Sequence, residues 1–282
     1  EMSASLVGSE MCIRDRVRKN MKPIVSFDVD MTLLDHKDWT IPDSAMETLE
    51  RLRENYTIVL ATGRDMDSSF SVVLKEQIRP DAIIHLNGTK ITVGDTIIYE
   101  HLFDKELMKK IIAYAQEDAA CSVGASVGGY DYYVHPEVVN RHDTDLWGEC
   151  GRRFADPWKL PDLDVRTMAY IGDEKGAKAM GARFPEVNVH MFAEKRGADV
   201  VEKTASKAMG LIRLCDYFNI PLSSTVAFGD SMNDYDIVKT AGIGIAMGNA
   251  MEELKEAADY VTDAVDSDGI RNACVHFGLI RL

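Results

Sequence analysis

The sequence predicts an α/β protein in which a parallel sheet forms the core and a smaller α+β unit is inserted in the middle of the chain. Short apolar runs such as "PIVSF" alternate with segments of helical spacing after residue 21. Strands that are apolar throughout are typical of parallel sheets covered on both faces. The pattern changes after Gly88 and returns after residue 193. We therefore expect a core of residues 21–88 and 194–282, with an inserted domain of residues 89–193.

The first twenty residues are expected to take no part in the fold. Their segment "SLVGSEMCIRDR" is similar to the translation of a sequencing adapter, so we place the natural start at Met21. The alternative is an ordinary disordered N-terminal tail. Both interpretations make residues 1–20 a non-native or disordered extension.

The first half of the expected core alternates strands and helices. Its first helix follows the start signal Pro42-Asp43-Ser44. The predicted order is strand, helix, strand, helix, strand, at residues 23–30, 43–55, 56–64, 65–78 and 81–88. Catalytic groups on parallel sheets sit at the carboxyl ends of the strands, so we look for the site there.

The middle of the chain has a different pattern. Alternating apolar and polar residues surround Gly94-Asp95, which is a hairpin signal. Helical and strand-like segments follow, with helices near 104–118 and 174–183 and strands near 121–127, 130–135, 166–171 and 187–192. The chain then returns to strand and helix from residue 198, and apolar runs at 225–229, 243–247 and 259–262 complete the core.

Composition limits the possible partners and location. The 282 residues are 46% hydrophobic and 28% charged, which is typical of a globular protein. The net charge of −14 argues against a nucleic acid or an anionic membrane as partner. The five cysteines are scattered without metal-binding or disulfide spacing, as expected of a cytoplasmic protein, and no apolar run could span a bilayer. No GxxxxGK[ST] loop is present, which disfavours a nucleotide-driven enzyme.

Two acidic clusters follow apolar strands. Asp28 and Asp30 lie in "FDVDMT", and two carboxylates this close need a divalent cation or a shared proton. The alternative is a solvated loop, because Asp is common at strand ends. Asp230, Asn233 and Asp234 lie in "FGDSMND" and offer the oxygen ligands that magnesium prefers. Their alternative is to cap the helix that follows.

Two further segments could bind an anion. Thr62 ends a predicted strand with Gly63 next to it, where a hydroxyl and backbone N–H groups can hold a phosphate. Lys207 lies in the first turn of a predicted helix, where the helix dipole disfavours a cation. An anionic neighbour would explain that placement. The alternative is a solvated surface lysine.

Together, "DVDMT", "ATGR", the lysine of "SKAMGL" and "GDSMND" resemble the four motifs of the haloacid dehalogenase (HAD) superfamily of phosphohydrolases, in the same order. The inserted unit resembles the α+β cap of the Cof-type subfamily, class IIB, on a Rossmann-like core. The resemblance covers residues 21–282. It implies a Mg²⁺-dependent phosphatase that hydrolyses small phosphorylated metabolites, sugar phosphates foremost, through an aspartyl phosphate.

The resemblance also implies residue roles. Asp28 would be the nucleophile and Asp30 the general acid and base. Mg²⁺ would be bound by Asp28, the backbone carbonyl of Asp30 and Asp230, with support from Asp234. The phosphoryl oxygens would be held by Thr62 and Lys207, while Asn233 would orient the network. Arg64 and Asn87 follow strands that border the site and are weaker candidates for substrate contact, with a turn or surface role as the alternative.

Met31 departs from the family's commonest form, which has glycine at this place. We expect Met31 in an ordinary backbone conformation, lining the site or the opening toward the cap, with activity retained. In the insert, a group of aromatic and basic residues could recognise the leaving group, although an ordinary surface or core role is the alternative for each: Tyr130, Tyr132, His135, Arg141, His142 and Trp147.

Two other functions stay open. A phosphomutase or phosphotransferase would keep the same four motifs and pass the phosphoryl group to a second hydroxyl. A non-catalytic phosphometabolite-binding protein would keep the fold without the chemistry. We expect a monomer or weak homodimer whose partner is a small phosphorylated metabolite.

Overall fold

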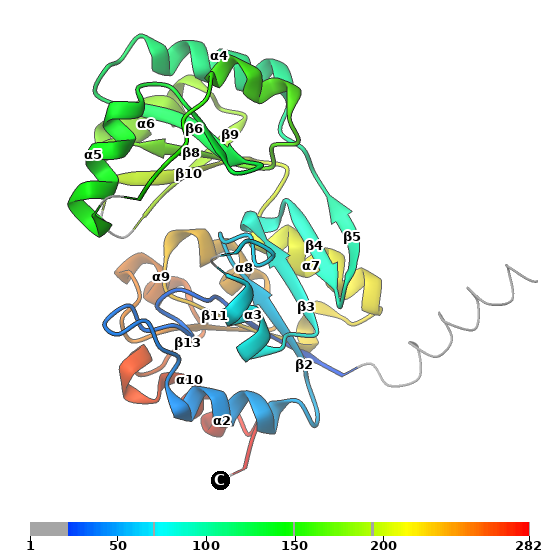
Figure 1. Ribbon diagram of the computed structural model, residues 1–282. Coiled ribbons are helices and arrows are strands. Elements are labelled where there is room, and N and C mark those ends of the chain that lie inside the picture. Colours follow the sequence, from blue (N-terminus) through cyan, green and yellow to red (C-terminus); the bar gives the residue numbers. More distant parts are fainter. Residues whose placement is uncertain (1–21, 70, 149, 193–194, 282) are drawn as a thin grey trace, which may run out of the picture. The chain divides into compact units, whose positions relative to one another are not determined.

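The computed structural model describes residues 22–281 apart from four positions, namely residues 70, 149, 193 and 194. The predicted N-terminal extension lies outside the described residues. The chain divides into two compact units (Figure 1). The first takes in the described residues up to Thr62, then Met66–Ile84 and the residues from Lys207 onward. The second takes in Gly63–Asp65 and His85–Ser206.

The larger sheet has eight strands in the order β13-β12-β11-β1-β2-β3-β4-β5. At its centre, β1 (Ile24–Phe27) pairs in parallel with β11 (Thr225–Gly229) on one side and with β2 (Thr57–Ala61) on the other. β4 and β5 form an antiparallel hairpin, as the sequence predicts. The remaining strands are β3 (Ala82–His85), β4 (Lys90–Val93), β5 (Thr96–Glu100), β12 (Ile243–Ala246) and β13 (Tyr260–Val261).

Both faces of this sheet are covered. Neighbouring residues of a strand point to opposite faces, and all four residues of β1 are buried. On one face, α2 (Asp43–Leu52) and α10 (Gly269–His276) share a hydrophobic cluster with the strands. Elsewhere α7 (Lys207–Phe218) approaches β3 so closely that a Cβ on Gly210 would lie 2.4 Å from Ile84. The other helices of the unit are α3 (Val72–Ile78), α8 (Tyr235–Thr240), α9 (Glu252–Ala257) and the 3₁₀ turn η4 (Met232–Asp234).

The second unit contains a five-stranded antiparallel sheet in the order β7-β6-β8-β10-β9. Its core is formed by buried residues such as Ile111, Val123 and Tyr170. The strands are β6 (Ser122–Val127), β7 (Tyr130–Tyr133), β8 (Met168–Ile171), β9 (Val187–Met191) and β10 (Gly197–Glu202). The helices are α4 (Lys105–Gln116), α5 (Pro136–Trp147) and α6 (Glu174–Arg183).

The end of the inserted unit differs from the position expected from the sequence. The return of the strand and helix pattern suggested an end at residue 193, whereas the compact unit runs to Ser206. The physical reason is β10, which forms hydrogen bonds with β8 and β9 and so completes the second sheet. The apolar pattern of a strand does not indicate which of two sheets the strand will join.

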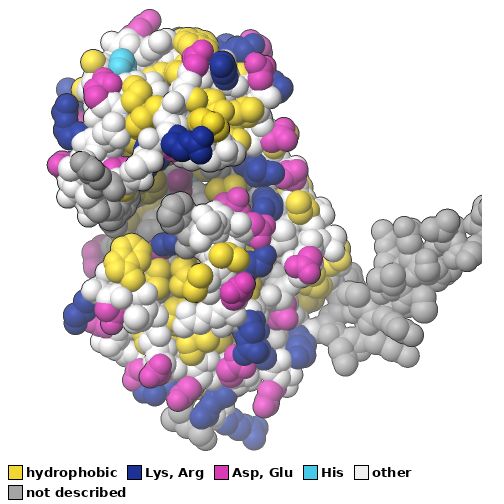
Figure 2. Space-filling model, viewed as in Figure 1, with side chains coloured by type: hydrophobic (Ala, Val, Ile, Leu, Met, Phe, Trp, Pro, Cys, Tyr) yellow, Lys and Arg dark blue, Asp and Glu magenta, His cyan; other side chains and the backbone are white. Residues whose placement is uncertain are grey.

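Charged side chains of both signs lie interspersed on the face of the described residues shown in Figure 2. Among the described residues, none of the helices combines the length and apolar character needed to cross a membrane.

Candidate active site

The ends of three neighbouring strands bring polar residues to one edge of the larger sheet. β1 is followed by Asp28, β11 by Asp230 and β2 by Thr62. The last residue of β1, Phe27, lies opposite Phe228, and their rings stack 4.9 Å apart. Because the carboxyl ends of parallel strands share one edge, the sheet positions the two carboxylates side by side.

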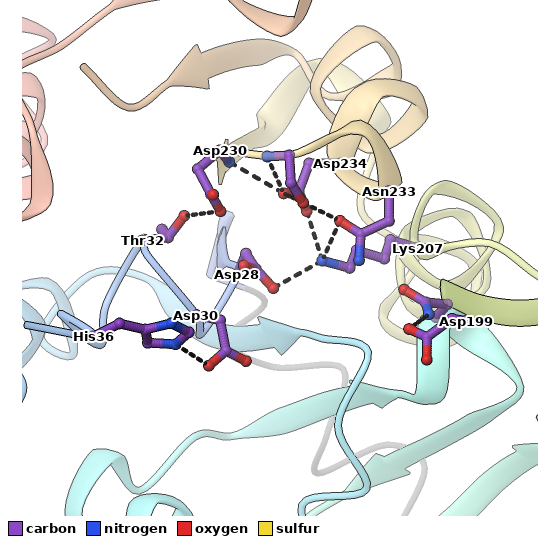
Figure 3. A network of polar contacts seen from close by, with 11 residues as sticks. Asp28, Asp30, Thr32, His36, Asp199, Lys207, Asp230, Asn233 and Asp234 are labelled. Carbon is purple, nitrogen blue, oxygen red and sulfur yellow. Dashed lines mark hydrogen bonds and ion pairs between the residues drawn. The ribbon is translucent and has the colours of Figure 1, made fainter. Parts of the chain in front are cut away.

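Lys207 is a buried cation in this site (Figure 3). Its Nζ donates hydrogen bonds to Oδ1 of Asp28 and Oδ1 of Asp234, both at 2.7 Å, and to Oδ1 of Asn233 at 3.3 Å. The side chain is 0% exposed. Burial alone would lower the pKa of Lys207, but Asp234 and Asp28 outweigh burial and raise it. The ammonium group is therefore charged and held in place.

Two carboxyl groups near Lys207, those of Asp28 and Asp230, have raised pKa values. Burial raises the pKa of Asp28 to about 7; Asp234 and Asp30 add to the rise, while Lys207 opposes it. Burial also raises the pKa of Asp230 well above its ordinary value, with the charges of Asp28 and Asp234 as further causes. Shifts in this direction mean that the ionised form of both carboxyl groups is disfavoured, mainly by burial and further by the neighbouring carboxylates.

The charge count of the cluster matches a divalent metal. Asp28, Asp230 and Asp234 each offer one carboxylate oxygen, and these oxygens lie within 4.8 Å of one another. Three carboxylates and one lysine sum to −2 when all are ionised, so one divalent cation would neutralise the cluster. Carboxylate oxygens are the ligands that hard divalent cations prefer. This acidic group can therefore hold a divalent metal.

The turn after β11 gives the two oxygens of Asp234 different partners. Oδ2 accepts hydrogen bonds from the backbone N–H groups of Asp230 at 3.1 Å and Ser231 at 3.2 Å, while Oδ1 accepts from Lys207. Ser231 caps η4 in a capping box with Asp234. Helix capping and a site role thus apply together here. The close packing of Asp234 against the end of β11 requires glycine at position 229, because a Cβ there would lie 2.4 Å from the Cβ of Asp234.

Two residues near the first acidic pair complete the polar network. Thr32 is buried, and its hydroxyl donates to Oδ1 of Asp230 at 3.3 Å, which fixes that carboxylate. Asp30 is half-buried, and its Oδ1 lies 2.7 Å from Nε2 of His36 (Figure 3). Asp28 and Asp30 therefore have separate partners, a lysine for one and a histidine for the other.

A sequence model of the haloacid dehalogenase-like hydrolases matches residues 25–273. The chain belongs to this family. The match spans all four predicted motifs, and it confirms the family expected from the sequence. Among relatives, phosphatase YwpJ of Bacillus subtilis is 44% identical over 282 residues, covering 90% of this chain and 99% of the relative.

Two other similar proteins span nearly the full length. The 5-amino-6-(5-phospho-D-ribitylamino)uracil phosphatase YcsE of Bacillus subtilis is 40% identical over 271 residues, covering 91% of this chain and 96% of the relative. The solved structure of the HAD subclass IIB sugar phosphatase BT4131 is 29% identical with a TM-score of 0.81, covering 92% of this chain and all of that chain. These matches confirm the predicted class of enzyme, a phosphatase, and the α/β core with an inserted α+β cap.

In this HAD-like hydrolase the conformation of Met31 differs from the prediction. We expected an ordinary backbone conformation, but Met31 has φ 57°, in the left-handed region that favours glycine. Two hydrogen bonds hold it there: its N–H donates to Leu34 O at 2.8 Å, and its carbonyl accepts from Nδ2 of Asn249 at 2.8 Å. Its half-buried side chain packs against the core. These contacts offset a conformational cost of about 1–2 kcal/mol.

Gly63, Arg64 and Asn87 belong to the second compact unit. Asn87 is buried with φ 54°, and its Nδ2 donates to Oδ2 of Asp199 at 2.9 Å. A Cβ on Gly63 would lie 2.9 Å from the same oxygen. The backbone carbonyl of Arg64 accepts from the N–H of Leu86 at 3.1 Å. Their roles in substrate binding stay predictions.

The candidates for leaving-group recognition also lie in the second unit. Tyr130 is exposed, and its hydroxyl accepts from Arg153 at 2.8 Å while the guanidinium lies over its ring. His142 is buried beside Asp143. The side chain of Trp147 lies outside the described part of the chain. Substrate contact by these residues stays a prediction.

Sequence reasoning missed three residues that the structure adds to the site. Thr32 stands in the "DVDMT" motif, so its nearness to the acids was a usable signal. Ser231 stands three residues before Asp234, which is the spacing of a capping box. His36 had no signal, because only the fold of the loop after Leu34 brings it back to Asp30.

Proposed function

We propose that the protein is a Mg²⁺-dependent phosphatase of small phosphorylated metabolites, sugar phosphates foremost, and that it works through an aspartyl phosphate on Asp28. The observation that carries this proposal is the cluster in which a buried lysine pairs with Asp28 and Asp234, with a carboxylate oxygen of Asp230 within 4.8 Å of theirs. Phosphoryl transfer depends mainly on fixed positive charge around the transferred oxygens. Lys207 supplies one such charge.

In the first step an oxygen of Asp28 would form a bond to phosphorus as the bond to the ester oxygen breaks. Lys207 orients Asp28 through its 2.7 Å hydrogen bond and thereby fixes the direction of attack. The departing oxygen would take a proton from Asp30, leaving as a neutral alcohol.

In the second step water would attack phosphorus of the aspartyl phosphate. The water would give one proton to Asp30, and the bond between phosphorus and Asp28 would break. Inorganic phosphate leaves, Asp28 returns to a carboxylate and Asp30 to its protonated form. Both residues thus end the cycle as they began it.

The assignment of the metal rests on the fit of the acidic cluster. We assign Mg²⁺ to Asp28, Asp230 and the backbone carbonyl of Asp30, with Asp234 in support through its contact with Lys207. When bound, Mg²⁺ would reduce the repulsion between the Asp28 carboxylate and the phosphoryl oxygens. The raised pKa values of Asp28 and Asp230 support this assignment, because buried carboxylates close to one another are stabilised in their ionised form by a cation.

The remaining assignments concern the substrate. We assign contact with the phosphoryl group or its ester to the residues that the family resemblance indicates, namely Thr62, Gly63, Arg64, Asn87, Lys207 and Asn233. The names of two relatives favour a phosphate on a sugar or a reduced sugar chain, since one is a sugar phosphatase and the other acts on a phosphoribitylamino compound. A cytoplasmic location and a monomer or weak homodimer stay proposals, with scattered free cysteines in support of the former.

A panel of phosphate esters assayed with Mg²⁺ and with a chelator tests the proposal. Wild type should release phosphate only with Mg²⁺, and Asp28→Asn should release none. Asp236→Asn is the matched control, because Asp236 is an exposed aspartate in the same segment as Asp234. Equal release by wild type and Asp28→Asn would refute the mechanism. Absence of release by wild type across the panel would favour a binding protein.

A further inference from the structure

The second acid of the motif, Asp30, contacts a histidine in the loop that follows it. The side chain of Asp30 is 32% exposed, and the partner at its Oδ1 is Nε2 of His36, at 2.7 Å. Asp28, in contrast, is buried and fixed by Lys207. A carboxyl group that must deliver a proton to one atom of a bound ester depends on its orientation. The loop that carries His36 contributes to that orientation for Asp30 through this contact.

This loop is closed by its own hydrogen bonds. The N–H of Asp35 donates to Thr40 O at 2.9 Å, and the N–H of Lys37 donates to Oδ1 of Asp35 at 2.9 Å. The N–H of Thr40 donates to Oδ1 of Asp38 at 3.1 Å. Leu34 is buried at the base of the loop and bridges to Asp30. The loop is thus a compact turn that returns the His36 ring to Asp30.

Trp39 holds the other side of the His36 ring. The two rings stack with centroids 4.3 Å apart and planes 19° apart. Trp39 has φ 59°, a left-handed conformation that is costly for a bulky residue, and it is 55% exposed. Core packing therefore does not account for its conformation. The strained backbone places the indole against the imidazole, and an observed strain of this kind points to function.

We propose that His36, held by Trp39, is the positioning residue of Asp30 in the phosphatase reaction, and that it is needed for esters whose leaving oxygen must be protonated. This inference rests on the proposed function. Nε2–H of His36 donates to Oδ1 of Asp30 and keeps its own proton throughout. Oδ2 of Asp30 gives its proton to the ester oxygen as the P–O bond breaks, and in the second step Oδ2 takes a proton from water.

The test uses two kinds of substrate with kcat/KM as the readout, because kcat/KM reports the steps up to the release of the alcohol. An alkyl phosphate needs a proton on its leaving oxygen, whereas 4-nitrophenyl phosphate releases a stable phenolate. His36→Ala should lower kcat/KM for the alkyl phosphate about 10- to 100-fold, within the range of general acid catalysis. For 4-nitrophenyl phosphate the loss should stay below about 3-fold.

Conservative variants separate positioning from simple structural support. His36→Gln retains an N–H donor and should recover part of the activity on the alkyl phosphate. Trp39→Ala should also lose more activity on the alkyl phosphate than on 4-nitrophenyl phosphate, but by a smaller factor than His36→Ala. Trp39→Phe keeps an aromatic ring beside His36 and should recover the activity on the alkyl phosphate. His276→Ala is the matched control, because His276 is an exposed histidine whose ring stacks on Tyr260 at 4.4 Å. It should leave both substrates unaffected.

Two results would overturn the inference. The first is an equal loss on both esters in His36→Ala, which would mean general disruption. The second is no loss on the alkyl phosphate. Failure of the proposed function is seen separately, as absence of hydrolysis by wild type or as full activity of Asp28→Asn. If Asp30→Asn spared the alkyl phosphate, the acid role of Asp30 itself would be wrong.

Discussion

Replacing Asp28 by asparagine should stabilise the metal-free protein at neutral to alkaline pH, although it abolishes catalysis. Burial raises the pKa of Asp28 from 3.8 to about 7 in the folded protein. Between these two values the folded chain binds more protons than the unfolded chain does. The free energy of unfolding therefore falls as pH rises from about 4 to about 7 and levels off above that.

The size of the effect follows from the shift. A difference of about 3 pKa units, at about 1.36 kcal/mol per unit, gives about 4 kcal/mol of lost stability once Asp28 is fully ionised. Asparagine resembles the neutral acid and keeps a carbonyl oxygen for Lys207. We expect the free energy of unfolding of Asp28→Asn to match that of wild type near pH 4 and to exceed it by about 4 kcal/mol near pH 8.

Urea unfolding in the presence of a chelator, repeated across this pH range, measures the difference directly. At high pH, saturating Mg²⁺ should make wild type more stable than Asp28→Asn, because the metal stabilises wild type through a ligand that the variant lacks. Asp236→Asn should follow wild type throughout. If Asp28→Asn were no more stable than wild type near pH 8 without metal, the inferred cost of ionising the buried Asp28 carboxyl group would be incorrect.

Three further substitutions have defined outcomes. Lys207→Met leaves two buried carboxylates without their cation, so it should destabilise the protein by about 3–5 kcal/mol in urea unfolding, and an unchanged stability would contradict the network. Thr32→Val removes the hydroxyl that fixes Asp230, so Mg²⁺ affinity by calorimetry should fall about 10-fold, with Thr32→Ser near wild type. Met31→Gly removes the cost of a left-handed conformation in the folded state but raises the conformational entropy of the unfolded chain. The free energy of unfolding should therefore change by less than about 1 kcal/mol. The rate of phosphate release by Met31→Gly should differ only modestly from that of wild type, and a gain of several orders of magnitude would refute that expectation.

The elements that the sequence predicted well are those with strong local signals. Apolar runs located the central strands, and the Gly94-Asp95 turn located the hairpin between β4 and β5. The helix expected over residues 65–78 begins only at Val72, and the described residues from Met66 to Ser71 form turns and a bend. Helix α5 was missed; it begins at Pro136, the first-turn position that proline favours.

The sequence predicts site residues that lie in motifs at strand ends and at a helix start. It does not predict contacts that depend on the conformation of a loop. Asp28, Asp230 and Lys207 follow from strand ends and a helix start, and the structure brings them together. The link between Asp30 and His36 depends on a closed turn whose geometry no local pattern encodes. The conformation of Met31 was mispredicted, because tertiary hydrogen bonds outweigh the intrinsic preference of a methionine backbone.

In the proposed reaction the phosphoryl group passes through Asp28. An acid quench during turnover, followed by peptide mapping with mass spectrometry, locates any phosphoryl group on the chain. We predict a hydroxylamine-sensitive acyl phosphate on the peptide that contains Asp28, formed by wild type and absent from Asp28→Asn. A phosphoryl group on another residue, or the same label in Asp28→Asn, would show that Asp28 is not the nucleophile.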